Sequence, residues 1–305
     1  MKIQRGWLAG PVRLAAISAI VAGLAAQAAP VVGGLAAPVI ACSPATPAAA
    51  VGAAPPAATP LADATAPAAF PAAGGEVTVF AAASLTEAFT TMGDDLEAAH
   101  PGLEITFNFA GSQALVTQMT GGAEADVFAP ANLTQMAAAA DAGLIAGEPV
   151  PFARNRLAVA APASNPAGID EAADLARDGV KLVLALPEVP AGRYAREAIC
   201  AMGDAAFVEA VAANVVSEEE DVRDVLAKVQ LGEADAGIVY VTDARAGGDQ
   251  VLTVAMPAGA DPVAVYPIAA TAEGDRALAE AFIGYVLSAE GQATLAEFGF
   301  EPAGA

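Results

Sequence analysis

Two short stretches decide how this chain folds: residues 79–85 read VFAAASL, and residues 110–113 read AGSQ. Each follows an apolar run typical of a strand, and each opens an amphipathic helix with a serine in its first turn, Ser84 or Ser112. The first N–H groups of a helix lack partners within the helix and carry a partial positive charge, so a helix entrance can hold an anion. Two such entrances in one chain indicate a protein that binds small oxyanions.

The same serines also fit an ordinary structural role. Residues 84–87 read SLTE, the pattern of a capping box in which the serine side chain accepts from the backbone N–H three residues on. Ser112 follows Gly111, and its spacing is also that of a helix cap. A hydroxyl can accept from a backbone N–H and still donate its own proton to a ligand. The pattern alone therefore leaves both roles open.

The residues around these entrances predict a parallel sheet. The apolar pattern follows a βαβαβα order, with strands at 76–81, 103–109 and 125–128 and helices at 84–100, 112–120 and 133–142. Such an order builds parallel strands with helices on the faces of the sheet, joined by right-handed crossovers. In these sheets ligands bind at the carboxyl ends of the strands, and both serines lie at such points.

A second unit of the same kind begins at Asn155. Its strands are predicted at 156–161, 181–186 and 236–240, and its helices at 191–202 and 222–229. A further strand at 263–270 and two helices at 275–287 and 291–298 close the chain. The expected fold class is therefore α/β with two lobes, each a mixed, mostly parallel sheet flanked by helices, with crossovers near residues 155 and 263.

The first 41 residues read as a signal peptide. Lys2, Arg5 and Arg13 form a basic start, and residues 14–41 are small and apolar without a charge. Residues 39–42, VIAC, resemble the processing box of bacterial lipoproteins, which implies that Cys42 becomes the first residue and carries the lipid. Secretion with cleavage near residues 26–28 and a retained membrane anchor are the alternatives.

Residues 42–75 are expected to form a tether. They are mostly Ala, Pro, Thr and Gly, with Asp63 as their single charge. Such a segment cannot bury enough apolar surface to offset the entropy lost on ordering. We therefore expect it to link the folded part to the membrane.

The charge of the chain excludes nucleic acid as a partner. Lys and Arg number 13 and Asp and Glu number 35, for a formal net charge of −22, so no basic stripe is available to displace counterions. An anion site in so acidic a protein must work through local dipoles and hydrogen bonds against the overall field.

Histidine and cysteine are too few for a metal centre or a hydrolytic site. His100 is the only histidine and precedes a proline at the end of a predicted helix, where it reads as a surface cap. With Cys42 lipidated, Cys200 has no partner and is expected to be a small buried residue. A hydrolase using Ser84 or Ser112 would need an activating base, and neither serine lies in a G-x-S-x-G turn. We therefore expect no enzyme activity, no resident cofactor and no zinc or iron site.

Seven segments in a fixed order give the chain a specific resemblance. They are VFAAASL (79–85), AGS (110–112), GAEADVFA (122–129), NRLAV (155–159), VPAGRYA (189–195), EDVR (220–223) and AGIVY (236–240). This series resembles the molybdate-binding proteins of bacterial ABC importers and covers residues 76–302. The resemblance implies a type II periplasmic-binding fold with the ligand in the cleft between the lobes. Lobe I would comprise residues 76–155 plus 264–305, and lobe II residues 156–263.

The resemblance also implies five ligand-binding residues. In that family the serine of the Ala-Ala-Ser-Leu turn and the serine of the Gly-Ser entrance bind the anion, and here they are Ser84 and Ser112. The Pro-Ala-Gly turn would contribute the N–H of Ala191, and the Asp-Val-Arg helix start the N–H of Val222. The strand that ends in Ile-Val-Tyr would contribute the hydroxyl of Tyr240. By pattern alone, the last three also fit helix-start chemistry, core packing and a packed aromatic ring.

Backbone N–H, serine and tyrosine groups supply only donors, which suits a dianion with four acceptor oxygens and disfavours protonated phosphate. We expect high-affinity binding of molybdate and tungstate by an extracytoplasmic, lipid-anchored monomer that delivers the anion to an ABC permease. The alternatives are a sulfate-selective or tungstate-selective protein of the same fold and, in a different class, a purely structural module. Arg193 and Arg223 are expected to lie at the surface or in ion pairs. Residues 129–132, APAN, depart from the serine-containing turn of many relatives, so the contacts of that loop stay open.

Overall fold

The first lobe is built on a mixed sheet, and strands from both the beginning and the end of the described chain belong to it. A computed structural model describes residues 40–42, 70–72 and 74–304, so most of the predicted signal peptide and tether lies outside the described residues. The strands stand in the order β11-β4-β10-β3-β1-β2. Their bounds are β1 (Gly75–Ala82), β2 (Leu103–Ala110), β3 (Val127–Ala129), β4 (Ile145–Asn155), β10 (Ala264–Thr271) and β11 (Glu301–Pro302). Strand β1 pairs in parallel with β2 and β3, whereas β10 runs antiparallel to β3 and β4.

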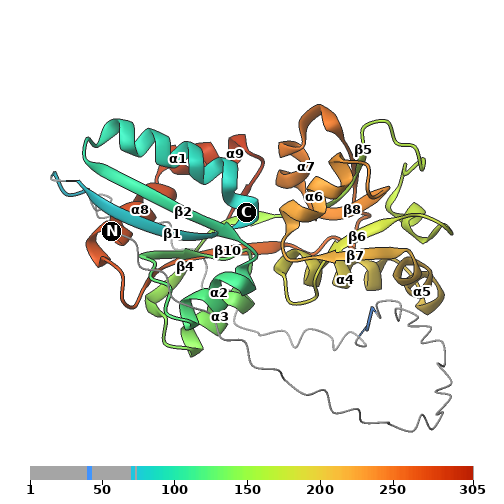
Figure 1. Ribbon diagram of the computed structural model, residues 1–305, viewed down its shortest axis with the longest axis horizontal. Helices are drawn as coiled ribbons and strands as arrows, with labels where there is room; N and C mark the ends of the chain where they lie inside the picture. The colour runs from blue at the N-terminus through green and yellow to red at the C-terminus, as the bar shows by residue number, and fades with distance from the viewer. Residues whose placement is uncertain (1–39, 43–69, 73, 305) are drawn as a thin grey trace, which may run out of the picture. The chain divides into compact units, whose positions relative to one another are not determined.

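Helices cover both faces of this sheet. A short 3₁₀ turn (Ala83–Leu85) leads into α1, and the helices are α1 (Thr86–Ala99), α2 (Ser112–Thr120), α3 (Leu133–Asp141), α8 (Arg276–Leu287) and α9 (Ala289–Glu297). In Figure 1, α1 and α9 lie on one face of the sheet and α2 and α3 on the other. The predicted apolar face of α1 is the buried one, with Phe89 and Met92 completely covered. Phe89 contacts the rings of Phe107, Phe152 and Phe282, which joins α1 and α8 over the sheet.

The second lobe is built in the same way on a smaller sheet. Its strands stand in the order β7-β6-β8-β5-β9, with β6 parallel to β7 and β8, and β5 antiparallel to β8 and β9. Their bounds are β5 (Leu157–Pro162), β6 (Leu182–Ala185), β7 (Val215–Glu219), β8 (Ala236–Tyr240) and β9 (Val251–Ala255). The helices are α4 (Pro190–Met202), α5 (Ala205–Ala213), α6 (Val222–Gln230) and α7 (Val241–Ala246), with 3₁₀ turns at Ala172–Ala176 and Gly248–Gln250.

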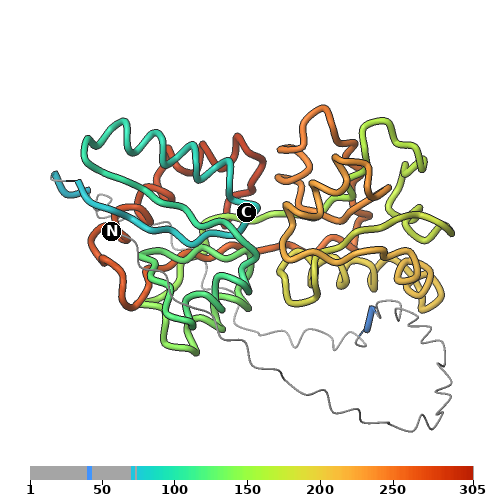
Figure 2. Tube along the Cα trace, in the orientation of Figure 1, coloured from blue at the N-terminus to red at the C-terminus, as the bar shows by residue number. Residues whose placement is uncertain are grey.

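The chain passes between the two sheets twice. Figure 2 shows one passage in green, from β4 to β5, and one in orange, from β9 to β10. The two passages are neighbours, since Ala264 at the start of β10 pairs with Asn155 at the end of β4. The predicted α/β class, with two mixed sheets flanked by helices, is confirmed.

Strand β4 was not predicted, and its composition explains why. It contains Gly147, Pro149 and Pro151, residues that rarely occupy the middle of a strand. It pairs with β10 through two register irregularities, between Tyr266 and Pro267 and between Ile268 and Ala270. Irregular pairing of this kind tolerates residues that a regular ladder excludes.

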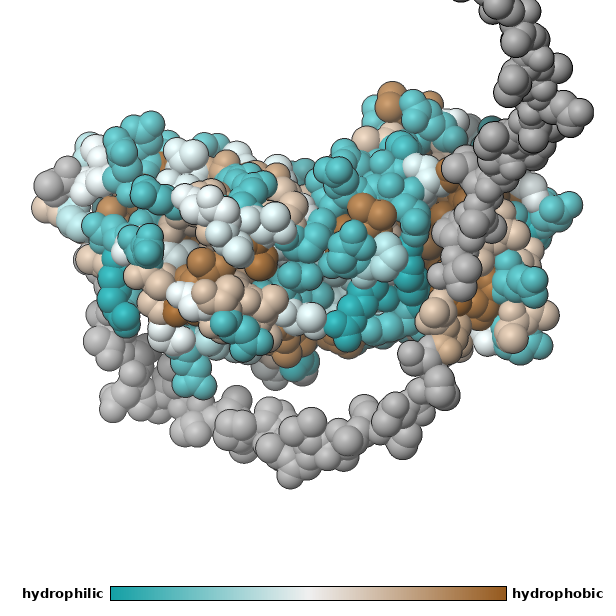
Figure 3. Space-filling view, turned by 60° about the horizontal axis from the view of Figure 1, so that its bottom comes forward, coloured by the Kyte–Doolittle hydropathy of each residue, from teal (hydrophilic) through white to brown (hydrophobic). Residues whose placement is uncertain are grey.

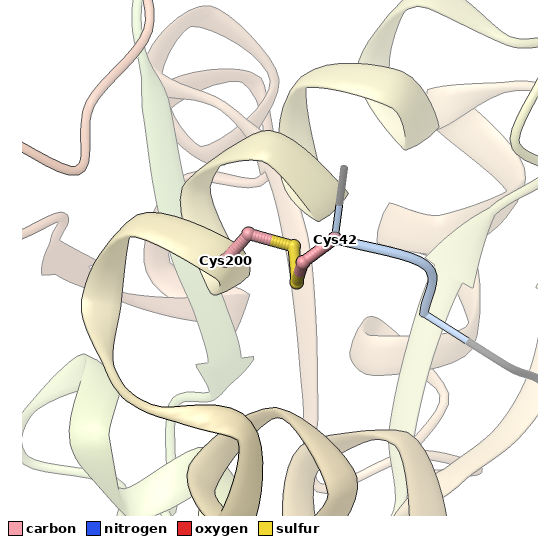
Figure 4. Close-up of a disulfide and its surroundings, with 2 residues drawn as sticks. All are labelled: Cys42 and Cys200. Carbon is pink, nitrogen blue, oxygen red and sulfur yellow. A yellow bond between two sulfur atoms is a disulfide. The ribbon is translucent and has the colours of Figure 1, made fainter. Parts of the chain in front are cut away.

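The pairing of the two cysteines differs from the expectation for Cys200. Cys42 and Cys200 form a disulfide in this structure, with their Cα atoms 5.6 Å apart, and Figure 4 shows Cys42 against the helix α4 that carries Cys200. The expectation that Cys200 lacks a partner is therefore wrong. It rested on a lipid at Cys42, and one sulfur cannot hold both a thioether and a disulfide. Ile40, two residues before Cys42, is also buried. Among the described residues, no helix has the length and apolarity to cross a bilayer.

A protein with this pairing should contain no free thiol, because the chain has only these two cysteines. Thiol titration of the exported protein, denatured without reductant, measures this. In the Cys200→Ser variant one thiol, that of Cys42, should become titratable. A native protein with one free thiol and a lipid mass on the Cys42 peptide would contradict the pairing.

Candidate anion-binding site

One small cavity brings together all five residues that the sequence singled out. Ser84 and Ser112 line it from the first lobe, and Ala191, Val222 and Tyr240 from the second. The remaining lining residues are Ala82, Ala83, Ala110, Gly111, Ala131, Val189, Pro190 and Asp221. The five residues come from positions up to 156 apart in the chain, so the fold alone gathers them. Their role as ligands stays a prediction.

Each of the five lies where a strand of one of the sheets is followed by a helix. Ser84 lies between β1 and α1, Ser112 begins α2 after β2, and Ala191 is the second residue of α4. Val222 begins α6 after β7, and Tyr240 ends β8 directly before α7. The first N–H groups of a helix have no partner in that helix. The cavity is therefore surrounded by backbone ends that favour negative charge.

The serines do not cap the helices. Ser84 belongs to the 3₁₀ turn, the residue before α1 is Leu85, and no side chain caps this helix end. Glu87, which the capping-box pattern would turn back to the serine, instead bonds Arg223 of the second lobe. The residue before α2 is Gly111, so Ser112 is already inside the helix. The capping role that the spacing allowed is thus absent at both serines.

The hydroxyl of Ser112 can donate a hydrogen bond into the cavity. Its Oγ accepts a hydrogen bond from the backbone N–H of Ala131 at 3.0 Å, and the side chain is buried. A hydroxyl that accepts from the protein still has one proton to donate. Ala131 belongs to the loop that departs from the family pattern, and its contribution is a backbone N–H for which any residue would serve.

Ser84 contacts Tyr266, which in turn contacts Asn155, and the sequence indicated neither of these two as a site residue. Its Oγ lies 2.9 Å from the hydroxyl of Tyr266 in β10, and Nδ2 of Asn155 lies 3.4 Å from that same hydroxyl. Asn155 belongs to one of the seven quoted segments, whereas nothing in the local pattern distinguishes Tyr266 from an ordinary strand residue. The 182 positions between Ser84 and Tyr266 put this contact beyond any spacing rule.

Tyr240 lines the cavity with a buried hydroxyl beside that of Tyr266. Its ring is buried, and within the described residues its hydroxyl makes no hydrogen bond. Burial raises the pKa of Tyr240 well above its ordinary value, so the hydroxyl keeps its proton. A buried hydroxyl without a partner is costly in a protein interior. An anion in the cavity would provide the missing acceptor.

The single acidic side chain of the cavity wall is occupied elsewhere. Oδ1 of Asp221 accepts from the backbone N–H of Arg223 at 2.7 Å and from that of Asp224 at 3.1 Å, and so caps α6. Val222 precedes both of these residues, at the first position of the helix. The Asp221 cap therefore does not use the N–H of Val222, and this N–H can donate to a ligand in the cavity.

Side chains bridge the two lobes around the cavity. Nε2 of Gln113 donates to the carbonyl of Glu220 at 2.9 Å, and Nε2 of Gln135 donates to the carbonyl of Glu188 at 3.2 Å. The guanidinium of Arg193 donates to the hydroxyl of Thr134 at 2.7 Å. In the view of Figure 3, hydrophilic residues gather over the middle of the molecule. The lobes thus meet through polar contacts.

Arg223 links the lobes through charge. It pairs with Glu87 of α1 in the first lobe and, at 2.8 Å, with the buried Asp243 of α7 in its own lobe. Arg193 pairs with Glu197. Both arginines are therefore in ion pairs, as the sequence indicated. Burial raises the pKa of Asp243 to about 7, although the neighbouring Arg223 acts in the opposite direction.

A second hollow is a poorer candidate for an anion. It lies on the first lobe, and its lining includes Gly122, Glu124, Gly143, Thr271 and Glu273. Two carboxylates in the wall repel an anion, and none of the unpartnered buried polar atoms of the described residues belongs to this wall. The cavity between the lobes is the candidate site.

Two α/β lobes that close on one small cavity lined with donors define the class of solute-binding proteins. The chain belongs to the bacterial extracellular solute-binding protein family, whose model matches residues 77–301. It is 45% identical to the molybdate-binding protein ModA of Mycobacterium tuberculosis over 225 residues, 73% of this chain and 84% of that protein. It is 34% identical to ModA of Haemophilus influenzae, over 75% of this chain and 91% of that protein. The periplasmic molybdate-binding protein of Azotobacter vinelandii shares the fold, with a TM-score of 0.65 at 19% identity, over 73% of this chain and 98% of that chain.

Gly111, at the entrance to α2, lies close to the backbone of the second lobe. A Cβ on Gly111 would lie 2.4 Å from the carbonyl oxygen of Glu220 in the other lobe. Relieving such an overlap costs about 1–3 kcal/mol, so Gly111→Ala should weaken binding of molybdate by roughly 5- to 150-fold. Calorimetric titration measures the affinity.

Gly121→Ala is the matched control, because Gly121 ends the same helix and its nearest contact, 3.3 Å away, lies within the first lobe. It should bind as the wild type does. Gly111→Ala should also melt at nearly the wild-type temperature, since the nearest contact of its Cβ within the first lobe is the flexible end of the Gln113 side chain, which can move. Unchanged affinity in Gly111→Ala would show that closure does not bring Glu220 this close.

The raised pKa of Asp243 makes stability depend on pH. Between about pH 4 and pH 7 the folded protein keeps a proton on this carboxyl that the unfolded chain has lost, so the contribution of Asp243 to stability falls as pH rises. The free energy of unfolding of the wild type, relative to Asp243→Asn, should decrease over this interval. Urea denaturation at a series of pH values measures the difference, and a difference that increases with pH would contradict a raised pKa.

Proposed function

We propose that this protein binds molybdate outside the cytoplasm and delivers it to an ABC importer. One observation carries the proposal: Ser84, Ser112, Ala191, Val222 and Tyr240 line a single cavity between the lobes. The hydroxyl of Ser112 has its acceptor role filled by the protein, and that of Tyr240 has no protein partner among the described residues. The curated relatives named as molybdate-binding proteins support the choice of anion.

The chemistry of the cavity favours a fully deprotonated tetrahedral anion. Molybdate and tungstate present four acceptor oxygens and no proton, which matches hydroxyl and backbone N–H donors. The one carboxylate of the wall, that of Asp221, is engaged in the helix cap through Oδ1, which leaves fewer acceptors for an anion that carries an O–H. A buried donor without an acceptor costs about 1–3 kcal/mol. Tungstate belongs to the proposal as a second ligand because it has the same charge and shape.

The proposal extends to the way the protein works. The anion is the transported ligand and not a resident cofactor, and the protein catalyses no reaction. Binding closes residues 76–155 plus 264–305 onto residues 156–263 by a hinge at the two crossover segments, and the permease recognises the closed monomer. Polar contacts across the cleft, such as the pair of Glu87 and Arg223, support closure because they form only when the lobes meet.

Export and anchoring are part of the same proposal. Residues 1–41 act as the signal peptide and residues 42–75 as the tether. Lipid attachment at Cys42 would hold the protein at the membrane, and it requires molecules in which Cys42 is not bonded to Cys200. A lipid-anchored molecule would carry Cys200 as a free thiol, so the thiol titration described above decides between the lipid anchor and the disulfide.

Ser84→Ala tests the proposal. Removing one charge-assisted hydrogen bond costs about 1.5–3 kcal/mol, so the affinity for molybdate should fall by roughly 10- to 150-fold. Calorimetric titration of the purified protein, repeated in the presence of excess sulfate, measures the affinity and the selectivity.

Ser164→Ala is the control, because Ser164 is exposed in the loop after β5 and does not line the cavity. It should bind as the wild type does. No heat with molybdate, or equal affinity for sulfate, would overturn the proposal for the wild type. A Ser84→Ala variant that melts at a lower temperature but binds with full affinity would favour a purely structural role for Ser84.

A further inference from the structure

A buried polar chain behind the cavity connects Ser84 to the crossover between the lobes. Asn155 ends β4 at the crossover, Tyr266 lies in β10, and both are buried. Nδ2 of Asn155 lies 2.8 Å from Oγ1 of Thr242 in the second lobe and 3.4 Å from the hydroxyl of Tyr266. The hydroxyl of Tyr266 in turn lies 2.9 Å from Oγ of Ser84. The chain therefore runs from the second lobe, through the crossover, to the wall of the cavity.

The backbone fixes which way the amide of Asn155 points. Its Oδ1 accepts from the N–H of Arg156 at 2.9 Å, so the oxygen of the amide is accounted for. The NH₂ group must then face Thr242 and Tyr266, and an NH₂ group only donates. The two distances from Nδ2 leave one of its hydrogens for each hydroxyl.

This orientation leaves the proton of Tyr266 available to Ser84. The oxygen of Tyr266 accepts from Asn155, and a phenol has one proton to give. Either hydroxyl could donate across the contact between Tyr266 and Ser84, and the arrangement that uses the proton of Tyr266 makes Oγ of Ser84 the acceptor. Burial also raises the pKa of Tyr266, so the proton stays on the phenol. The proton of Ser84 then has no acceptor among the described residues and is free to point into the cavity.

We propose that Tyr266, oriented by Asn155, is a positioning residue that makes Ser84 a donor toward the anion. This inference rests on the proposed function and deepens it by assigning the source of selectivity against protonated anions. The N–H of Ala131 orients the hydroxyl of Ser112 in the same way, because it donates to the Oγ of that serine. In this arrangement both serine hydroxyls present a proton to the cavity, and either could accept an O–H of the ligand only by turning that proton away from it.

The test compares molybdate with hydrogen phosphate, at a pH at which phosphate keeps a proton and molybdate has none. In Tyr266→Phe the hydroxyl of Ser84 has no fixed donor behind it and can turn its oxygen to the cavity. Affinity for molybdate should fall about tenfold, the effect of losing one oriented hydrogen bond. Affinity for hydrogen phosphate should fall much less or rise. The preference of the protein for molybdate over hydrogen phosphate, measured as the ratio of the two dissociation constants, should therefore decrease.

A double-mutant cycle separates positioning from general damage to the fold. On the Ser84→Ala background the hydroxyl that Tyr266 orients is gone, so Tyr266→Phe should have little further effect on molybdate affinity. Tyr285→Phe is the matched control: Tyr285 lies on α8, outside the cavity wall and outside this polar chain. It should leave both affinities and their ratio unchanged.

Two results would overturn the inference. In one, Tyr266→Phe weakens both anions by the same factor. In the other, its effect on molybdate is as large with Ser84→Ala as with the wild-type serine. Either would assign Tyr266 to packing alone while leaving the proposed function intact. Failure of the wild-type protein to bind molybdate at all would instead overturn the proposed function itself.

Discussion

The structure depends on one constraint: a cavity for an anion must be lined by hydrogen-bond donors that the protein does not use elsewhere. A fold meets this constraint most easily where strands end and helices begin, because the first N–H groups of a helix have no internal acceptor. In this chain five such junctions converge, two from the first sheet and three from the second. The mixed sheets and their crossovers matter to function because they set these junctions against one another.

The strongly acidic composition is compatible with this design. A formal net charge of −22 repels anions at long range, but solvent and salt screen the exposed charges, whereas the donors act at contact distance in a buried space. Near the cavity the acidic groups are engaged: Asp221 caps α6, and Glu87 and Asp243 share Arg223. These engagements keep carboxylates from competing for the donors, and the link from Glu87 to Arg223 also ties the two lobes together.

The sequence predicts much of the fold and the wall of the cavity, because both are recorded in local patterns. Alternating and helical periodicity indicates most strands and helices, and short segments in order identify Ser84, Ser112, Ala191, Val222 and Tyr240. The strand with Pro149 and Pro151 could not be predicted, since only its irregular pairing with β10 accommodates it. The capping box at Ser84 failed because a 3₁₀ turn precedes α1 and Glu87 has a stronger partner across the cleft. Tyr266 and the partner of Cys200 are contacts between distant segments, which no local spacing reveals.

The central claim is that the donors at these five junctions enclose the anion. An anomalous difference map at the molybdenum absorption edge, from crystals of the protein grown with molybdate, tests it most directly. The account predicts one strong peak in the cavity between the lobes, surrounded by Ser84, Ser112, Ala191, Val222 and Tyr240. A peak elsewhere, for example in the hollow beside Glu124 and Glu273, or no ordered peak at saturating molybdate, would contradict it.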